Sequence, residues 1–146
     1  MYEHILISTD GSEVAQRGVD HGLSLAKSVG AKVTIVMVTE RFPIYPSPDW
    51  IPGPNEIADY EARQKEAATK VLADVKAGAD RLGVDVETVH VPEAQPAEAI
   101  VATANKRHCN LIVMASHGRR GLRRLLLGSQ TAEVLVSSSV PVLVVR

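Results

Sequence analysis

The 146-residue sequence predicts an α/β fold, a Rossmann-like open parallel sheet of five strands with helices on both faces. Five short apolar segments alternate with stretches of helical periodicity, which favours parallel strands joined by crossover helices. Three of these segments are near-continuous apolar runs, as expected for strands covered on both faces. The length fits one domain over residues 1–146, and the chain has no internal repeat.

We expect the strands at residues 4–9 (HILIST), 32–38 (KVTIVMV), 84–91 (VDVETVHV), 111–115 (LIVMA) and 140–145 (VPVLVV). The first, second and fourth are the continuous apolar runs. The last one suits a sheet edge, because its proline cannot donate to a strand ladder. A bare apolar edge is an aggregation risk, so we expect a homodimer in which two copies of this strand pair. The alternative is that a helix or loop covers the edge. The interface residues would be Val140, Pro141, Val142, Leu143, Val144 and Val145.

Helices are expected at residues 12–29, 55–82, 96–108 and 129–138. Gly30 and Gly83 follow the first two helices and suit helix ends. Pro96 suits a first helical position, and Ser129 suits an N-cap.

Residues 39–55 interrupt this alternation. They hold five of the eight prolines and three of the five aromatic residues, which predicts a stiff loop. Two interpretations stay open: a connector whose aromatic rings pack on the sheet or an adjacent helix, or a flap over a site or a contact for a partner.

Composition limits the classes of function. The formal net charge is −1, which argues against a nucleic-acid or membrane partner. The amino terminus lacks the pattern of a signal segment, and no apolar run is long enough to span a membrane. A single cysteine, Cys109, excludes an internal disulfide, and we expect it to be a packing residue. We therefore expect a cytoplasmic protein.

Two loops are candidates for a binding site. Open parallel sheets bind ligands beyond the carboxyl ends of the strands, where the strand order reverses. If the fourth strand lies beside the first, the loops at that point are STDGS (8–12) and ASHGRRGLRRLLLGSQ (115–130). The glycines of the second loop allow unusual backbone conformations and close approach to an anion, and the helix that follows favours a phosphate at its start. The alternative is a glycine-containing loop with a well-capped helix.

The charged residues of these loops have alternative roles. Any one of the four arginines can reach a phosphate, or all can be solvated while the neighbouring leucines point inward. The arginines are Arg119, Arg120, Arg123 and Arg124, and the leucines are Leu122, Leu125 and Leu126. His117 can contact a phosphate or be solvated or bonded to the backbone. Asp10 can accept a hydrogen bond from an adenine amino group or a ribose hydroxyl, or can cap the following helix, which is favoured from the sequence alone.

The two loops together resemble the universal stress protein family, over the full length of the chain. Ala115, two residues, Gly118, nine residues and then Gly128–Ser129 follow the spacing of the family's ATP-binding signature. TDGS at 9–12 matches the segment that supplies the family's aspartate, here Asp10. Ala115 departs from the signature, which has glycine there. Its methyl group would crowd a closely bound ligand, but it costs little where the local φ is negative.

The resemblance implies a single-domain, ATP-binding member with the strand order 3-2-1-4-5. It implies that Val38 offers backbone groups to adenine, that Thr9 and Met114 flank the base, and that the loop residues hold ribose and phosphates. It also implies a homodimer. The ligand would be ATP, with ADP and AMP as alternatives, and Mg²⁺ would accompany the phosphates. The implied loop ligands are Ala115, Gly118, Gly128, Ser129 and Gln130, with His117, Arg119 and Arg120 as further candidates.

The sequence favours a regulatory protein over an enzyme. It contains no Walker loop, no GxGxxG after the first strand and no GxSxG elbow, and it identifies no general base. We therefore expect a protein whose ATP occupancy is read by an unknown regulatory partner in a stress response. Two alternatives are a nucleotide-free dimeric interaction module and a weak ATPase or autophosphorylating protein.

Overall fold

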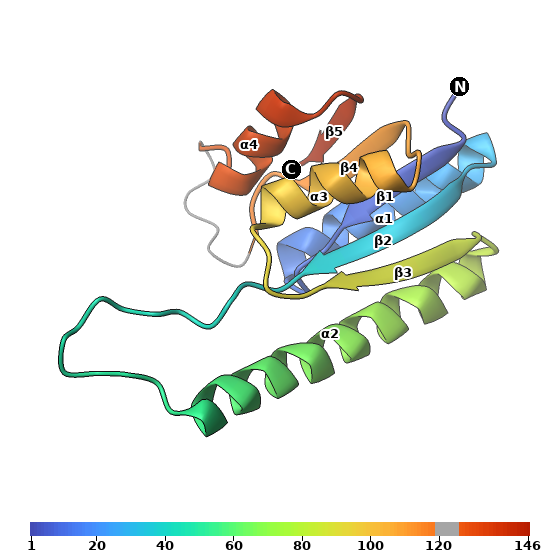
Figure 1. Ribbon diagram of the computed structural model, residues 1–146. Coiled ribbons are helices and arrows are strands. Elements are labelled where there is room, and N and C mark those ends of the chain that lie inside the picture. Colours follow the sequence, from blue (N-terminus) through green and yellow to red (C-terminus); the bar gives the residue numbers. More distant parts are fainter. Residues whose placement is uncertain (119–125) are drawn as a thin grey trace.

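The sheet contains five parallel strands in the order β3-β2-β1-β4-β5 (Figure 1). The computed structural model describes residues 1–118 and 126–146. This order confirms the predicted fold class and places the first and fourth strands side by side. The strands are β1 (His4–Ser8), β2 (Lys32–Val38), β3 (Val86–Val91), β4 (Leu111–Ala115) and β5 (Val142–Val145).

Helices cover both faces of the sheet, as predicted (Figure 1). One face packs against α1 and α2, and the other packs against α3 and α4. The helices are α1 (Glu13–Val29), α2 (Pro54–Leu82), α3 (Pro96–Lys106) and α4 (Ser129–Ser137).

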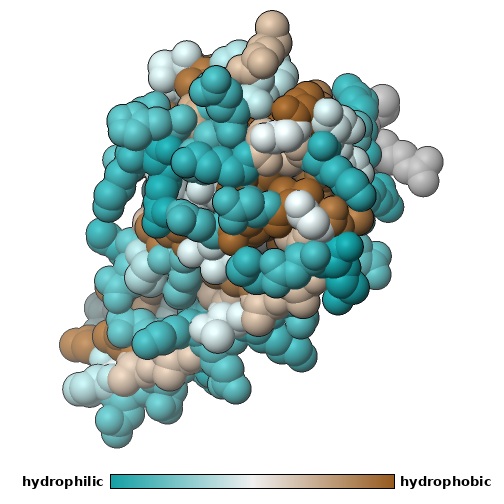
Figure 2. Space-filling view, turned by 90° about the vertical axis from the view of Figure 1, so that its right-hand side faces the viewer, coloured by the Kyte–Doolittle hydropathy of each residue, from teal (hydrophilic) through white to brown (hydrophobic). Residues whose placement is uncertain are grey.

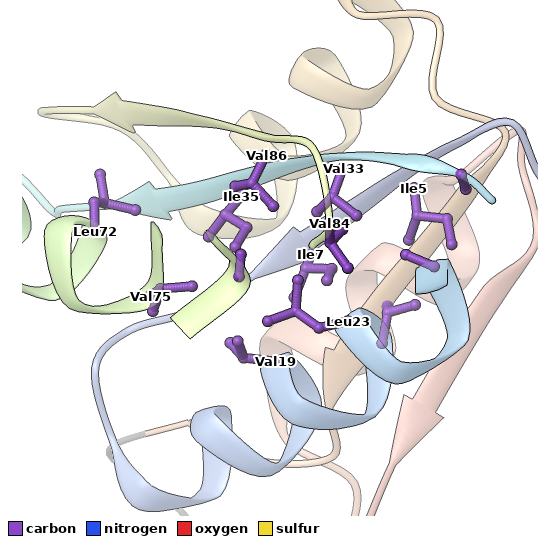
Figure 3. Packing of buried hydrophobic residues seen from close by; sticks show 14 of the residues in the cluster. Ile5, Ile7, Val19, Leu23, Val33, Ile35, Leu72, Val75, Val84 and Val86 are labelled. Atoms are coloured by element: carbon purple, nitrogen blue, oxygen red, sulfur yellow. The ribbon is translucent and has the colours of Figure 1, made fainter. Parts of the chain in front are cut away.

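The larger core lies between the sheet and the helices α1 and α2 (Figure 3). Ile7 and Ile35 from neighbouring strands and Val19 from α1 are fully buried there. Each such side chain contributes about 1.5–3 kcal/mol by leaving water. Because alternate residues of a strand point to opposite faces, Leu6 and Val36 belong instead to the second core, under α3 and α4.

Several predicted boundaries of strands and helices were wrong by one or two residues. At these positions the backbone ends a helix or bonds to a side chain and does not continue the predicted element. The third strand starts at Val86 because Val84 donates its N–H to Ala79 O at the end of α2. The third helix stops at Lys106 because His108 adopts a left-handed φ of 55°. The last strand starts at Val142, since Val140 is held in a turn by Ser138 Oγ.

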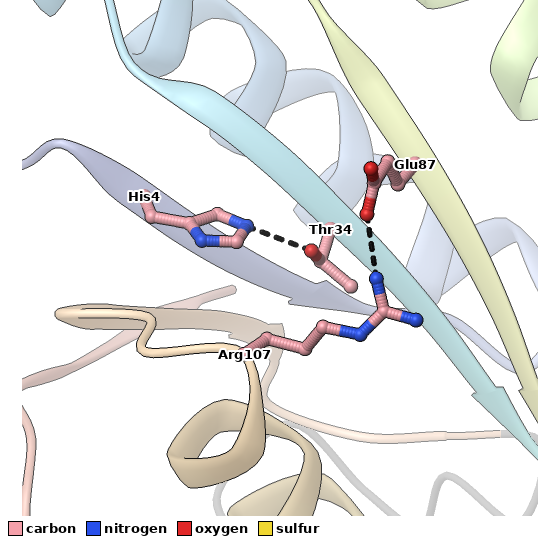
Figure 4. A network of polar contacts seen from close by, with 4 residues as sticks. All are labelled: His4, Thr34, Glu87 and Arg107. Carbon is pink, nitrogen blue, oxygen red and sulfur yellow. Dashed lines mark hydrogen bonds and ion pairs between the residues drawn. The ribbon is translucent and has the colours of Figure 1, made fainter.

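A polar network closes the amino end of the sheet on the α3 side (Figure 4). His4 Nε2 lies 2.7 Å from Thr34 Oγ1 on the neighbouring strand, and Arg107 forms an ion pair with Glu87 at 2.5 Å. Burial lowers the pKa of His4 below its ordinary value, and the nearby Lys32 charge acts in the same direction. The imidazole is therefore held in its neutral form.

Cys109 lies beside this network and is buried, as predicted for a packing residue. Burial raises the pKa of its thiol to about 11. The thiol is thus protonated at neutral pH and is not activated as a nucleophile.

The surface at the amino ends of the strands is mostly hydrophilic, with hydrophobic residues between the polar ones (Figure 2). None of the helices in the described ranges is both long enough and apolar enough to cross a membrane.

The proline-rich loop between β2 and α2 carries a small aromatic cluster. The rings of Phe42 and Trp50 stack with centroids 6.0 Å apart, and Phe42 meets Tyr60 of α2 edge to face at 5.2 Å. Phe42 thus packs on the adjacent helix, as the connector interpretation expected, and Trp50 packs on Phe42. Ile44, Tyr45 and Ile51 of the same loop remain exposed.

Candidate functional site

The site lies beyond the carboxyl ends of β1 and β4. These strands are hydrogen-bonded neighbours, with Ile7 opposite Val113. From β1 the chain proceeds through α1 to β2 on one side, whereas β4 and β5 lie on the other. This reversal of direction separates the two following loops and leaves a crevice at the sheet edge.

A cavity of about 700 Å³ occupies this crevice. Ten of the twelve predicted ligand-binding residues line it, and Arg119 and Arg120 lie outside the described residues. The structure thus brings together residues from three separate strand ends. Their contact with a nucleotide stays a prediction. The ten are Thr9, Asp10, Val38, Met114, Ala115, His117, Gly118, Gly128, Ser129 and Gln130.

The loop after β1 is held by its own side chains. Gly11 adopts a left-handed φ of 81° and donates its N–H to Thr9 Oγ1 at 3.2 Å. Asp10 Oδ1 accepts from the Ser12 N–H at 2.9 Å, and Ser12 is the N-cap of α1. Asp10 is therefore not the helix cap that the sequence favoured. The short Asx-type turn instead holds its carboxylate at the cavity wall.

Gly118 and Gly128 are required for space and not for an unusual backbone conformation. A Cβ on Gly118 would lie 2.7 Å from Asp10 Oδ2, and one on Gly128 would lie 2.9 Å from the Ser116 carbonyl oxygen. Neither glycine has a positive φ, so the expectation of special backbone freedom was wrong for both. The missing side chain of Gly118 lets the two loops approach each other closely, and that of Gly128 lets the start of α4 approach Ser116.

The start of α4 faces the cavity. Gly128 is the N-cap and donates its N–H to Ser116 O at 2.8 Å, so that group is already used. Ser129 is the first helical residue and not the predicted N-cap. The first intrahelical bond runs from Ala132 N–H to Gly128 O, so the N–H groups of Ser129, Gln130 and Thr131 have no partner within the helix. These groups and the helix dipole favour an anion.

Two side chains of α4 fix this helix start in place. Thr131 Oγ1 donates to Ala115 O at 3.0 Å in a buried position. Gln130 Oε1 accepts from Ala97 N–H at 3.0 Å and from Gln95 Nε2 at 2.9 Å, at the start of α3. The Gln130 side chain thus connects two helices, and only its backbone N–H is left without a partner within α4.

Val38 lies at the opposite end of the cavity, at the last position of β2. Thr39 N–H bonds to Val91 O, and Ala94 N–H bonds to Thr39 O, so the backbone of Thr39 faces β3. Because successive residues of a strand direct these groups to opposite sides, the N–H and C=O of Val38 face the β1 side. β1 has already ended at Ser8, so they face the space beyond it.

Ala115 and His117 begin the loop after β4. Ala115 has no positive φ, so its methyl group causes no backbone strain there. His117 Nδ1 lies 2.9 Å from Ser116 Oγ, and its Nε2 bonds to the Leu126 carbonyl oxygen. The imidazole is therefore bonded to the backbone, one of the roles that the sequence left open. Of the three leucines that one interpretation directed inward, Leu126 lines the cavity but is 66% exposed, and Leu122 and Leu125 lie outside the described residues.

The sequence analysis missed several wall residues. Tyr60 and Gln64 reach the cavity from α2, and Ile100 reaches it from α3. No local motif marks them, because α2 follows β2 and α3 follows β3, whereas the two candidate loops follow β1 and β4. Thr131 has a weak signal, a hydroxyl residue two positions after Gly128–Ser129. The remaining newly found residues are Ser8, Ala15, Met37, Thr39, Glu40, Pro96 and Leu127.

A doubly wound parallel sheet with a cavity at its switch point defines a class of ligand-binding α/β proteins. Within that class, the chain matches the universal stress protein family over residues 1–146. The chain belongs to this family.

Three relatives show the extent of the similarity. Universal stress protein MJ0531 of Methanocaldococcus jannaschii is 36% identical over 146 residues, which cover 100% of this chain and 83% of that protein. The solved structure of the MJ0577 protein of the same organism has a TM-score of 0.76 at 29% identity, covering 99% of this chain and 96% of that one. A universal stress protein crystallised in complex with cAMP has a TM-score of 0.73 at 26% identity, covering 99% and 97%.

Proposed function

We propose that this protein binds ATP in the cavity and acts as a nucleotide-dependent regulatory protein in a stress response. One observation carries the proposal: a single cavity of about 700 Å³ joins the start of α4 to the backbone of Val38. Its volume lies within the range of small-molecule sites, roughly 300–1,000 Å³. An anion site at one end and a base-pairing edge at the other are what a nucleotide requires.

The phosphates would lie at the start of α4. The N–H groups of Ser129 and Gln130 and the Ser129 hydroxyl would donate to them, with Arg119 and Arg120 as further candidates. Among the described residues, no group of three His, Cys, Asp or Glu side chains could hold a metal ion. Mg²⁺ would therefore arrive on the phosphates, with Asp10 as a nearby carboxylate.

The base would lie at the Val38 end. The backbone N–H and C=O of Val38 provide one donor and one acceptor, which match the two groups on an edge of adenine. Met114 and Thr9 would flank the ring, and the Asp10 carboxylate would accept from a ribose hydroxyl. The relative crystallised with cAMP supports an adenine nucleotide as the ligand. ADP and AMP are the alternative ligands.

Ligand release and thermal stability test this proposal. We expect the denatured protein to release adenine nucleotide, or ATP, ADP or AMP to raise the melting temperature. A ligand present at 100 times its Kd adds about 2.7 kcal/mol to the free energy of unfolding. Chromatography of ATP incubated with the protein would show whether it is also hydrolysed. No bound nucleotide and no shift with any of the three would contradict the proposal and favour the nucleotide-free module.

The dimer is a second part of the proposal. Val142–Val145 forms an edge strand whose four residues are all half-buried, and Val136 of the adjacent α4 is 88% exposed. Pairing of two β5 strands across a two-fold axis would cover this edge. Sedimentation equilibrium should give twice the monomer mass of 15.7 kDa. A monomer at micromolar concentration would contradict the dimer.

A further inference from the structure

The cavity has a wall that the nucleotide signature does not include, formed by one face of α2. Buried and half-buried residues recur along this helix at helical spacing. Ala68, Leu72, Val75 and Ala79, in the second half of α2, belong to the core against the sheet. Figure 1 shows that the first half of α2 extends past the carboxyl ends of β2 and β3. There the same face continues with Tyr60 and Gln64, which line the cavity.

Tyr60 is a fixed aromatic wall. Its hydroxyl donates to Glu40 O at 3.4 Å, and its ring meets Phe42 edge to face with a centroid distance of 5.2 Å and an angle of 84°. Phe42 in turn stacks on Trp50. The proline-rich loop thus holds the Tyr60 ring at the cavity before any ligand arrives.

Gln64 is one turn further along the same face, where the helical pattern calls for an apolar residue. It is half-buried and lines the cavity, and its amide has no hydrogen-bond partner in the part of the chain that the structure describes. A half-buried amide has one acceptor oxygen and two donor hydrogens for a ligand.

The strand order places both side chains at the base end of the cavity. The start of α4 follows β4, Val38 ends β2, and α2 packs against β3 and β2. A nucleotide with its phosphates at α4 and its base at Val38 would therefore bring the base towards α2.

We infer that Tyr60 and Gln64 determine which nucleobase the cavity accepts, an inference that rests on the proposed function. Tyr60 stacks on the base, an interaction that any base can make. Gln64 offers a donor and an acceptor together, which match N7 and the N6 amino group of adenine, on the edge that Val38 does not use. Guanine presents two acceptors, O6 and N7, on the corresponding edge and pairs less well with an amide. The site therefore selects adenine nucleotides over guanine nucleotides.

Calorimetric titration of ATP and GTP into four variants tests this inference. Gln64→Leu should lower the preference for ATP over GTP by about tenfold. Gln64→Lys, which has donors only, should lower it further. Tyr60→Leu should weaken both nucleotides by about tenfold and leave their ratio unchanged. Gln16→Leu, the same chemical change on the exposed face of α1, should alter neither affinity.

The outcomes separate this inference from the proposed function. Gln64 makes no hydrogen bond in the described part of the chain, so melting temperatures of its variants should match the unsubstituted protein, whereas Tyr60→Leu should melt slightly lower because it loses the Phe42 contact and the bond to Glu40 O. A wild-type protein that binds ATP while Gln64→Leu keeps the full ATP preference would overturn the role of Gln64. Unchanged affinities in Tyr60→Leu would overturn the role of Tyr60. If the wild-type protein binds neither nucleotide, the proposed function itself fails.

Discussion

The two ends of the sheet use polar groups in opposite ways. At the amino end, Asn110 Oδ1 accepts from the N–H groups of Glu3 and His4, and its Nδ2 donates to Met1 O. At the carboxyl end, Val38 and the start of α4 line a cavity, and three N–H groups of α4 have no partner within the helix. One end satisfies its backbone groups with side chains, whereas the other has helix N–H groups that have no partner within the helix and that begin at a cavity. Substitutions at the two ends should therefore separate stability from binding.

The largest effect is expected from Gly128→Val. Its Cβ would lie 2.9 Å from the Ser116 carbonyl oxygen, so the loop after β4 must move away from α4. We expect the affinity for ATP to fall by about 100-fold, or roughly 2.7 kcal/mol, in calorimetric titration. Gly78→Val is the matched control, because a Cβ there meets only the end of the Arg81 side chain at 3.7 Å.

Gly118→Val should have a similar effect, since its Cβ would lie 2.7 Å from Asp10 Oδ2. Sedimentation should show the same oligomeric state in both glycine variants as in the unsubstituted protein. Full ATP affinity in both variants would mean that this loop is not the phosphate site.

These glycines show what the sequence can and cannot reveal about the site. The spacing of Gly118 and Gly128 located the loop, and the strand pattern located its neighbour at Asp10. The physical reason for the glycines, a lack of room beside Asp10 and Ser116, needed coordinates. Tyr60 could not be assigned either, because nothing in the sequence states where α2 passes the end of the sheet.

The fold was more predictable than the site because each element has a local cause. Apolar runs marked the buried strands, and Gly30 and Gly83 marked helix ends, where both adopt a left-handed φ. The errors arose where backbone groups make contacts outside their own segment. Val84, for example, is apolar and buried, but its N–H completes the end of α2.

At the amino end, Asn110→Ala should lower stability and leave binding unchanged. The substitution removes two acceptor contacts and one donor contact to the backbone. We expect a loss of about 1–3 kcal/mol in the free energy of unfolding, measured by urea denaturation. ATP affinity in the folded variant should equal that of the unsubstituted protein. A parallel loss of affinity would show that the two ends are coupled through the sheet.

The smallest effect concerns the pH dependence of stability through His4. Burial lowers the pKa of the His4 imidazole in the folded state. In the unfolded chain the imidazole takes up a proton near the ordinary pKa of 6.5, whereas in the folded chain it takes up a proton only at lower pH. The stabilising contribution is complete above the ordinary pKa and is lost progressively as the pH falls below it towards the lower pKa of the folded state. The unfolding free energy should therefore decrease between pH 7.5 and 5.5, and His4→Gln should reduce this slope.

A second histidine, His90, lies near the cavity and should contribute to the same pH dependence of stability. Its pKa is also lowered, first by burial and then by the charge of Lys65, and its Nε2 lies 2.8 Å from Thr39 Oγ1. His90→Gln should thus remove a second part of the slope, and the double variant should remove both. Only the His90 substitution adjoins a residue of the cavity wall, so only it should change ATP affinity. An unchanged slope in His4→Gln would mean that the buried imidazole at the amino end accepts a proton without unfolding the chain.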